Sequence, residues 1–208
     1  MGVMGRRVVS AGVLAACMAV PLTFCKGSGS GGTAVGKAFL EKAAGHYGVT
    51  VKDVEGDLEC SAKTGGDAVA GVWQKDVKDG GVLHLIRRGG NVVGPGEPGY
   101  GPGLAFAACG IADRLPDEAA LAAGIFMKTS DAVSSVGEAL VRDLLLRQEA
   151  ADGRMPSLPS ASIIDGGWNL TFWTSDIDRG VYRRYKVFVM RDGKVELAAA
   201  EEIPYRQE

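Results

Sequence analysis

Few residues in this chain could do chemistry, and their spacing matches no catalytic motif. The chain has only two histidines, His46 and His84, and neither has a neighbour at the spacing of a metal site. His84 stands between two leucines in a strand-like run, so we expect it to face away from them as an exposed or edge side chain. No catalytic residue, metal or cofactor is therefore predicted, and His84 is the first residue to consider in a hydrolase.

Residues 94–99 satisfy the pattern G-x-G-x-x-G, which in dinucleotide-binding proteins cradles a phosphate. That role needs free backbone N–H groups and a helix that begins directly after the loop. Pro95 and Pro98 have no N–H group, and no helix is expected to start at this point. We predict a loop without phosphate-binding function.

The remaining polar and aromatic candidates favour ordinary surface and core roles. The acidic pairs Asp117-Glu118 and Glu201-Glu202 suit a first helical turn and a solvated strand end. Trp168 and Trp173 are five positions apart, so on one strand they face opposite sides of the sheet. We expect Trp173 to pack in the core and select Trp168 as the possible binding residue.

The N-terminal segment has the pattern of an export signal. Arg6 and Arg7 precede an uncharged apolar run over residues 8–16, which is typical of a secretory signal peptide. Residues 14–17, Leu-Ala-Ala-Cys, resemble the lipobox of bacterial lipoproteins. In that family the cysteine thiol is acylated and the preceding bond is cut, which implies a signal peptide over 1–16 and a lipid anchor on Cys17.

Two alternatives to this anchor remain open. Cys25 is followed by a Gly/Ser-rich run, and residues 17–32 have the composition of a flexible tether. If Cys25 carries the lipid, Cys17 leaves with the signal peptide. No unpaired cysteine then remains, because Cys60 and Cys109 can form a disulfide in an oxidising compartment. In the other alternative neither cysteine is acylated and the protein is secreted in soluble form.

The charge balance argues against nucleic acid as a partner. The chain has 23 Lys and Arg against 25 Asp and Glu residues, a formal net charge of −2. A mildly acidic protein is a poor electrostatic match for phosphate backbones. The expected partners are the membrane, through the anchor, and an envelope protein or cell-wall component.

Helical spacing of apolar residues predicts two long helices. The first follows Thr33 and ends at Gly48, and the second begins after Ser130 and is closed by Asp152-Gly153. Strand-like runs cover 81–88 and 181–190, and Asp192-Gly193 predicts a hairpin turn.

A sparse internal repeat links the two halves. Trp73, Asp76 and Gly80 recur as the same residue types about 100 residues later. The fold prediction is α+β, with two tandem modules, each a helix packed on a small antiparallel sheet. This arrangement resembles cystatin-like folds in outline, without a motif of that family.

The predicted organisation has five parts. A signal peptide (1–16) and tether (17–32) precede the first module (33–94). A Gly/Pro loop and Ala-rich helical insert (95–130) then lead to the second module (131–208). We expect an exported, lipid-anchored binding module of the bacterial cell envelope, on its periplasmic or outer face. An exported hydrolase and an envelope assembly factor are the alternatives.

Overall fold

The computed structural model describes residues 35–63, 65–78, 80–133, 138–143 and 148–206. This part of the chain is a mixed α+β fold with two antiparallel sheets. The predicted signal peptide and tether, with Cys17 and Cys25, lie outside the described residues. None of the described helices has the length and apolar character needed to cross a membrane.

The first sheet, sheet A, is a four-stranded meander in the order β1-β2-β3-β4. Its strands are β1 (Val54–Ser61), β2 (Ala68–Gln74), β3 (Leu83–Arg88) and β4 (Asn91–Val93). Helix α1 (Lys37–Tyr47) packs on one face of this sheet, and a short 3-10 turn, η1 (Val51–Asp53), joins it to β1. The first predicted helix is thus confirmed. It ends at Gly48, which adopts a left-handed backbone conformation, and its N-cap is Gly36.

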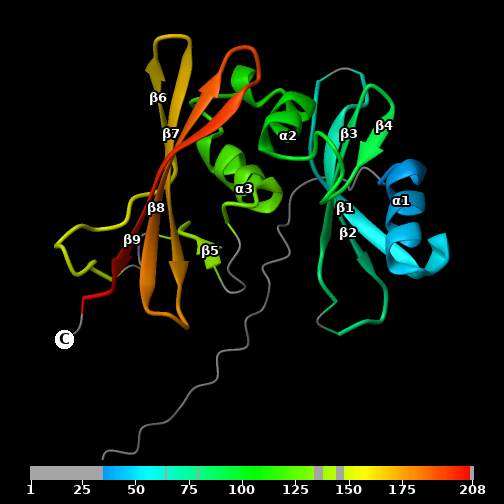
Figure 1. The fold of residues 1–208 in the computed structure, drawn as a ribbon, viewed down its shortest axis with the longest axis horizontal. Coiled ribbons are helices and arrows are strands. Elements are labelled where there is room, and N and C mark those ends of the chain that lie inside the picture. The colour runs from blue at the N-terminus through cyan, green and yellow to red at the C-terminus, as the bar shows by residue number, and fades with distance from the viewer. Residues whose placement is uncertain (1–34, 64, 79, 134–137, 144–147, 207–208) are drawn as a thin grey trace, which may run out of the picture. The chain divides into compact units, whose positions relative to one another are not determined.

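Alternation along β2 gives sheet A two buried faces. Ala68, Ala70 and Val72 pack against Phe39 of α1, whereas Val69 belongs to a second and larger core. Because successive side chains point to opposite faces of a strand, β2 contributes to both cores at once. Sheet A is therefore an inner layer of the fold (Figure 1).

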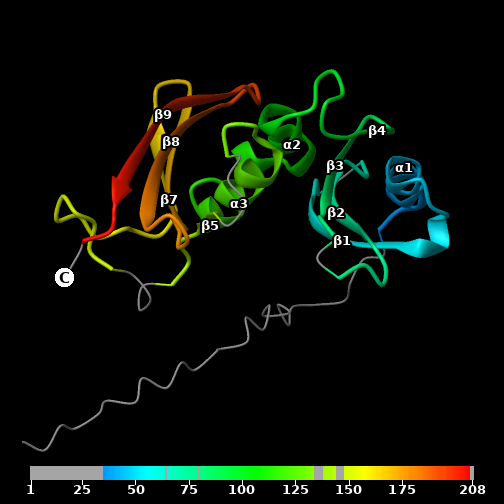
Figure 2. The same cartoon turned by 60° about the horizontal axis from the view of Figure 1, so that its bottom comes forward.

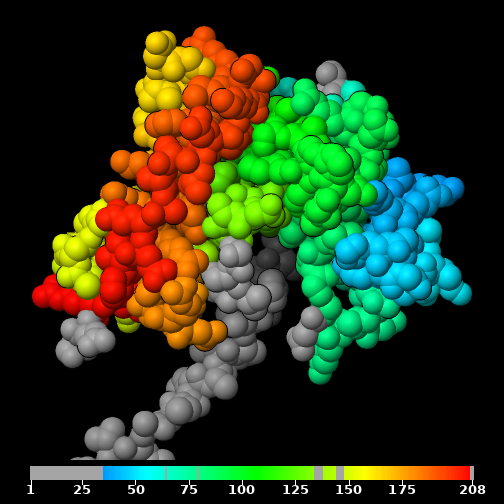
Figure 3. Space-filling view, in the orientation of Figure 1, coloured from blue at the N-terminus to red at the C-terminus, as the bar shows by residue number. Residues whose placement is uncertain are grey.

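The second face of sheet A is covered by helices α2 (Pro102–Cys109) and α3 (Ala119–Thr129), with η2 (Ile111–Asp113) between them. Their many small residues allow them to lie in a layer between sheet A and the second sheet, as the views of Figures 1 and 2 both show. With side chains drawn, the green atoms of this segment lie between the cyan and the orange atoms (Figure 3). The Ala-rich insert expected between two modules is thus the shared centre of the core.

The second sheet, sheet B, has five strands: β5 (Glu138–Leu140), β6 (Ser160–Ile164), β7 (Gly167–Asp176), β8 (Val181–Met190) and β9 (Val195–Pro204). Strands β5 and β6 both pair with β7, and the order continues to β8 and β9. The strand predicted over 181–190 and the hairpin turn at Asp192-Gly193 are confirmed. Phe172 and Tyr185 stack on the inner face, and Phe126 of α3 meets Phe172 edge-on.

The helix predicted after Ser130 is wrong. Residues 138–140 form β5, which pairs with residues 174–176 of β7. The Glu138 side chain is only 1% exposed and binds groups on β7 and β8, so tertiary contacts outweigh the local helical spacing. Sheet B takes its helical cover from α3 instead.

Candidate functional site

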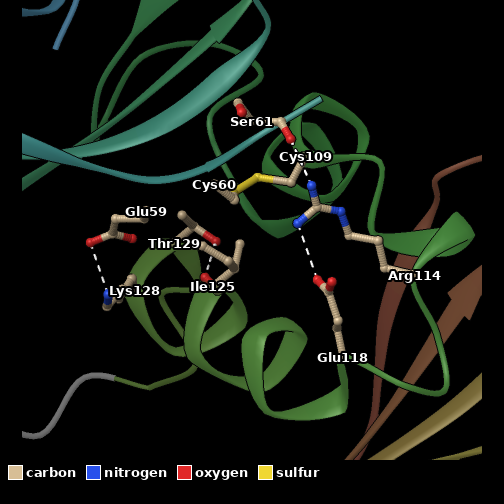
Figure 4. The surroundings of a disulfide bond; sticks show 9 residues. All are labelled: Glu59, Cys60, Ser61, Cys109, Arg114, Glu118, Ile125, Lys128 and Thr129. Atoms are coloured by element: carbon tan, nitrogen blue, oxygen red, sulfur yellow. Dashed lines mark hydrogen bonds and ion pairs between the residues drawn. A yellow bond between two sulfur atoms is a disulfide. The ribbon is translucent and has the colours of Figure 1, made fainter. Parts of the chain in front are cut away.

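A β-bulge in β1 places two side chains on the side of sheet A that faces α2 and α3. Leu58 pairs with Ala70 and Cys60 with Val69, so Glu59 is the extra residue between them. In an unbulged strand Cys60 would share the face of Leu58 and point toward α1. The bulge turns it to the other side, where it forms a disulfide with Cys109 at the end of α2, with the Cα atoms 5.5 Å apart. The predicted cysteine pairing is therefore present (Figure 4).

The same bulge directs Glu59 toward β2 and β3. Gly71 of β2 pairs with His84 of β3, and a Cβ atom at position 71 would lie 3.0 Å from Glu59 Oε1 and 3.7 Å from His84 Cε1. Glycine thus leaves the room that the carboxylate and the imidazole occupy.

Glu59, His84 and Lys128 form a cluster of three ionisable side chains. Glu59 Oε1 lies 3.1 Å from His84 Nδ1 and accepts a hydrogen bond of 2.8 Å from Lys128 Nζ at the end of α3. The side chains of Glu59 and His84 are 12% and 21% exposed. The expectation that His84 is an exposed or edge residue is therefore wrong, because α3 covers this face of sheet A.

The surroundings change the acidity of Glu59 and of Tyr100. Burial opposes ionisation of Glu59, but the contacts with His84 and Lys128 outweigh it and hold the pKa of this carboxyl below its ordinary value. Tyr100 donates a hydrogen bond of 3.1 Å to the His84 backbone oxygen. Burial, together with the charges of Asp131 and Glu59, raises the pKa of Tyr100 to about 12. At neutral pH the site therefore holds an ionised carboxylate beside a neutral phenol.

An open cleft with a volume of ≈ 530 Å³ adjoins this cluster. His84 and Lys128 line one wall, and β5 and the residues after it line the other. Apolar side chains from α3, the following loop and β5 complete the lining: Met127, Val133 and Leu140. A cleft of this size with a few polar groups on an apolar lining is typical of small-molecule sites.

Arg142 contributes the third basic group of the cleft. A Cβ atom added at Gly124 would lie 3.3 Å from Arg142 Nη2, which is the nearest atom to that position. A glycine inside a helix costs about 1 kcal/mol relative to alanine, and here it lets the guanidinium approach α3 closely. Arg142 is exposed and has no ion pair within the described part of the chain.

The acidic residue of the opposite wall is fully engaged. Glu138 Oε2 accepts a hydrogen bond of 2.8 Å from Arg183, and Oε1 accepts one of 2.8 Å from the Tyr185 hydroxyl and another from Thr174. Burial and this carboxylate raise the pKa of Tyr185. Glu138 therefore fastens β5 to sheet B and leaves its negative charge balanced by Arg183.

The other residues selected from the sequence lie away from this cleft. Trp168 is half-buried against the main core, and Trp173 is 4% exposed in a separate cluster on the other face, so their predicted opposite orientation is confirmed. Nothing in the structure tests Trp168 as a binding residue. His46 is exposed in the last turn of α1.

The G-x-G-x-x-G segment is a loop, as predicted, and the Glu97 side chain accepts a hydrogen bond from Gly94 N. The expectation that no helix starts nearby is wrong, since α2 begins at Pro102. Among the described residues, no group of three His, Cys, Asp or Glu side chains is placed to hold a metal ion.

Sequence reasoning missed Glu59, Lys128 and Arg142. The glycines Gly71, in a strand-like apolar run, and Gly124, inside an Ala-rich helical run, were available signals, because such glycines often mark close approach by another group. No protein-family model, curated protein or solved structure matches this chain. The site itself therefore carries the functional argument.

Proposed function

We propose that this protein is an exported, lipid-anchored binding protein of the bacterial envelope that holds a small anionic ligand in the cleft between β3, α3 and β5. The observation that carries the proposal is Arg142, an exposed guanidinium without an ion pair among the described residues, in a cleft that it shares with His84 and Lys128. A guanidinium binds a carboxylate through two parallel hydrogen bonds.

The charges around the cleft favour a ligand with one negative charge. Lys128 is paired with Glu59, and Arg183 of β8 is paired with Glu138. Among the described side chains that line the cleft, Arg142 is then the cation left to be neutralised. A carboxylate supplies that charge and meets the fork of the guanidinium.

Calorimetric titration with hexanoate and benzoate at pH 7 tests this proposal. We expect binding by the wild type and a loss of about tenfold or more in Arg142→Gln, because a charge-assisted hydrogen bond contributes about 1.5–3 kcal/mol. Arg88→Gln, at an exposed arginine of β3, is the matched control and should bind as the wild type does. No binding of either probe, or equal binding by both variants, would contradict the proposal.

The anchor is proposed from the lipobox-like residues that end at Cys17, with Cys25 as the alternative. The intact mass of the native protein extracted from membranes, before and after reduction and alkylation, tests it. A triacylated mass that begins at one of these cysteines supports the anchor. An unmodified mass in the soluble fraction overturns it and supports a secreted protein.

A second candidate function, hydrolysis, rests on the contact between Glu59 and His84. A carboxylate beside an imidazole stabilises the cation that forms when the imidazole accepts a proton, and His84 lines the cleft. The test is a broad screen of ester, amide and glycoside substrates with the wild type and His84→Gln. Activity that the substitution abolishes while hexanoate binding persists would favour the hydrolase.

We also propose that the two sheets belong to related modules, with α1 and α3 as the equivalent helices. In each sheet four consecutive strands form a meander, and residues 68, 70 and 72 face α1 as 168, 170 and 172 face the α2 and α3 layer. An experimental structure in which β1–β3 cannot be superposed on β6–β8 with these residues aligned would contradict the duplication.

A further inference from the structure

A second cleft lies beside the first along helix α3. It has a volume of ≈ 410 Å³ and is lined mainly by apolar residues at the start of α3 and before β6: Pro116, Ala119, Ala120, Leu121, Leu158 and Pro159. Leu158 is 38% exposed and presents part of its side chain to this cleft. This cleft therefore leaves an apolar surface open to solvent.

The two clefts share Arg142. They also share α3, whose first turns line the second cleft and whose last turns line the first. From Ala119 to Lys128 the helix rises by about 13 Å. The small residues Ala119, Ala120 and Gly124 leave space above this side of the helix. Arg142 therefore lies between the second cleft, which is mainly apolar, and the first cleft, which is basic.

The two clefts differ in charge, and this difference favours one orientation of a bound ligand. Asp117 is the acidic residue that lines the second cleft, whereas His84, Lys128 and Arg142 line the first, together with the paired Glu138. An anionic group is therefore favoured at Arg142 and disfavoured at the far end, beside Asp117. An apolar chain has the opposite preference.

We propose that the ligand is an anionic amphiphile, a carboxylate with an unbranched apolar chain, whose head binds Arg142 and whose chain lies along α3 in the second cleft. This inference rests on the proposed binding function and specifies its ligand class. Arg142 supplies the charge complementarity, and the apolar cleft that adjoins it supplies the space for the chain. An alkyl group there buries Leu158 and Leu121, which stabilises the complex through the hydrophobic effect.

Calorimetric titration with acetate, hexanoate, octanoate and decanoate below their micelle concentrations tests the chain. Each methylene buried in an apolar site contributes about fourfold in affinity. We expect affinity to rise by at least about tenfold from hexanoate to decanoate. Decyltrimethylammonium, with an unbranched chain of nearly the same length and the opposite charge, should bind at least about tenfold more weakly than decanoate.

Two variants locate the chain. Ala120 is exposed and lines the second cleft, so Ala120→Trp should fill that cleft without disturbing the core and remove the dependence on chain length. Benzoate binding should persist in this variant. Ala132→Trp, at an exposed residue outside both clefts, is the control and should keep the dependence.

The outcomes separate this inference from the proposed function. If hexanoate and benzoate bind but affinity does not rise with chain length, the amphiphile is overturned and the anion site stands. If affinity rises equally in Ala120→Trp, the chain lies elsewhere and the placement along α3 is overturned. If no carboxylate binds, both proposals fail.

Discussion

The carboxylate of Glu59 lies 3.1 Å from the imidazole of His84, on two strands that are separated by β2. The contact spans the intervening strand because the bulge directs Glu59 inward and Gly71 of β2 leaves the space between them free. A backbone irregularity and a missing side chain thus place Glu59 beside His84, which lines one wall of the cleft.

Gly71→Ala should destabilise the protein by about 1–3 kcal/mol, the usual cost of added volume in a packed region. The new methyl group would lie 3.0 Å from both Glu59 Oε1 and Val82 Cγ1. Urea unfolding measures the effect. Gly45→Ala is the control, since nothing lies within 4 Å of that position and alanine is favoured in a helix by about 0.5–1 kcal/mol. Stabilisation by both substitutions would refute the role given to Gly71.

Gly124→Ala should separate stability from binding. A Cβ atom at this position meets only Arg142 Nη2, at 3.3 Å, and α3 gains up to about 1 kcal/mol of helix propensity. We expect equal or higher stability in urea and a severalfold loss of hexanoate affinity, because Arg142 must move. Unchanged affinity would mean that the position of Arg142 over α3 does not matter for binding.

Glu59→Gln should lower the free energy of unfolding at pH 7 by about 1–3 kcal/mol, because it removes a buried charge that pairs with Lys128 and contacts His84. The folded state lowers the pKa of Glu59 from its ordinary 4.5. Its stabilisation is therefore present above pH 4.5 and is lost as pH falls through the lower, folded-state pKa.

The difference between wild type and Glu59→Gln should thus shrink in acid, which unfolding curves between pH 3 and 7 can measure. Asp57→Asn, at an exposed residue of the same strand, should show little effect at any pH. A difference between wild type and Glu59→Gln that grows in acid would contradict the assigned direction of the pKa shift.

Removal of the disulfide should cost about 4 kcal/mol, the loop-closure value for the separation of 49 residues between Cys60 and Cys109. We expect the double substitution Cys60→Ser with Cys109→Ser to unfold at lower urea concentration than the oxidised wild type. Reducing agent should lower the midpoint of the wild type and leave that of the double variant unchanged. Equal midpoints for wild type and variant would show that the bond does not form.

The sequence predicts those elements whose residues carry their own local signal. Helix α1 and its glycine cap, the strand at 181–190 and the turn at Asp192-Gly193 follow from spacing and turn chemistry. The pairing of Cys60 with Cys109 follows because these are the two cysteines outside the predicted signal peptide and tether. These features need no knowledge of distant contacts.

The errors arise where distant contacts decide the structure. Residues 138–140 have helical spacing, but Glu138 finds its partners on β7 and β8, and the segment becomes a strand. Glu59 enters the site through a bulge that no local pattern announces. Arg142 reaches the cleft through its approach to Gly124, on a separate element. The site therefore had to be found in the fold.

The chain's two histidines allow the most direct test of the anion site. His84 lines the cleft, and His46 lies in α1 outside it. In a ¹H–¹⁵N NMR titration with hexanoate at constant pH, we predict that the imidazole signals of His84 shift in a saturable way while those of His46 stay in place. Shifts of both histidines in parallel, or of neither, would contradict the central claim that this cleft binds a carboxylate.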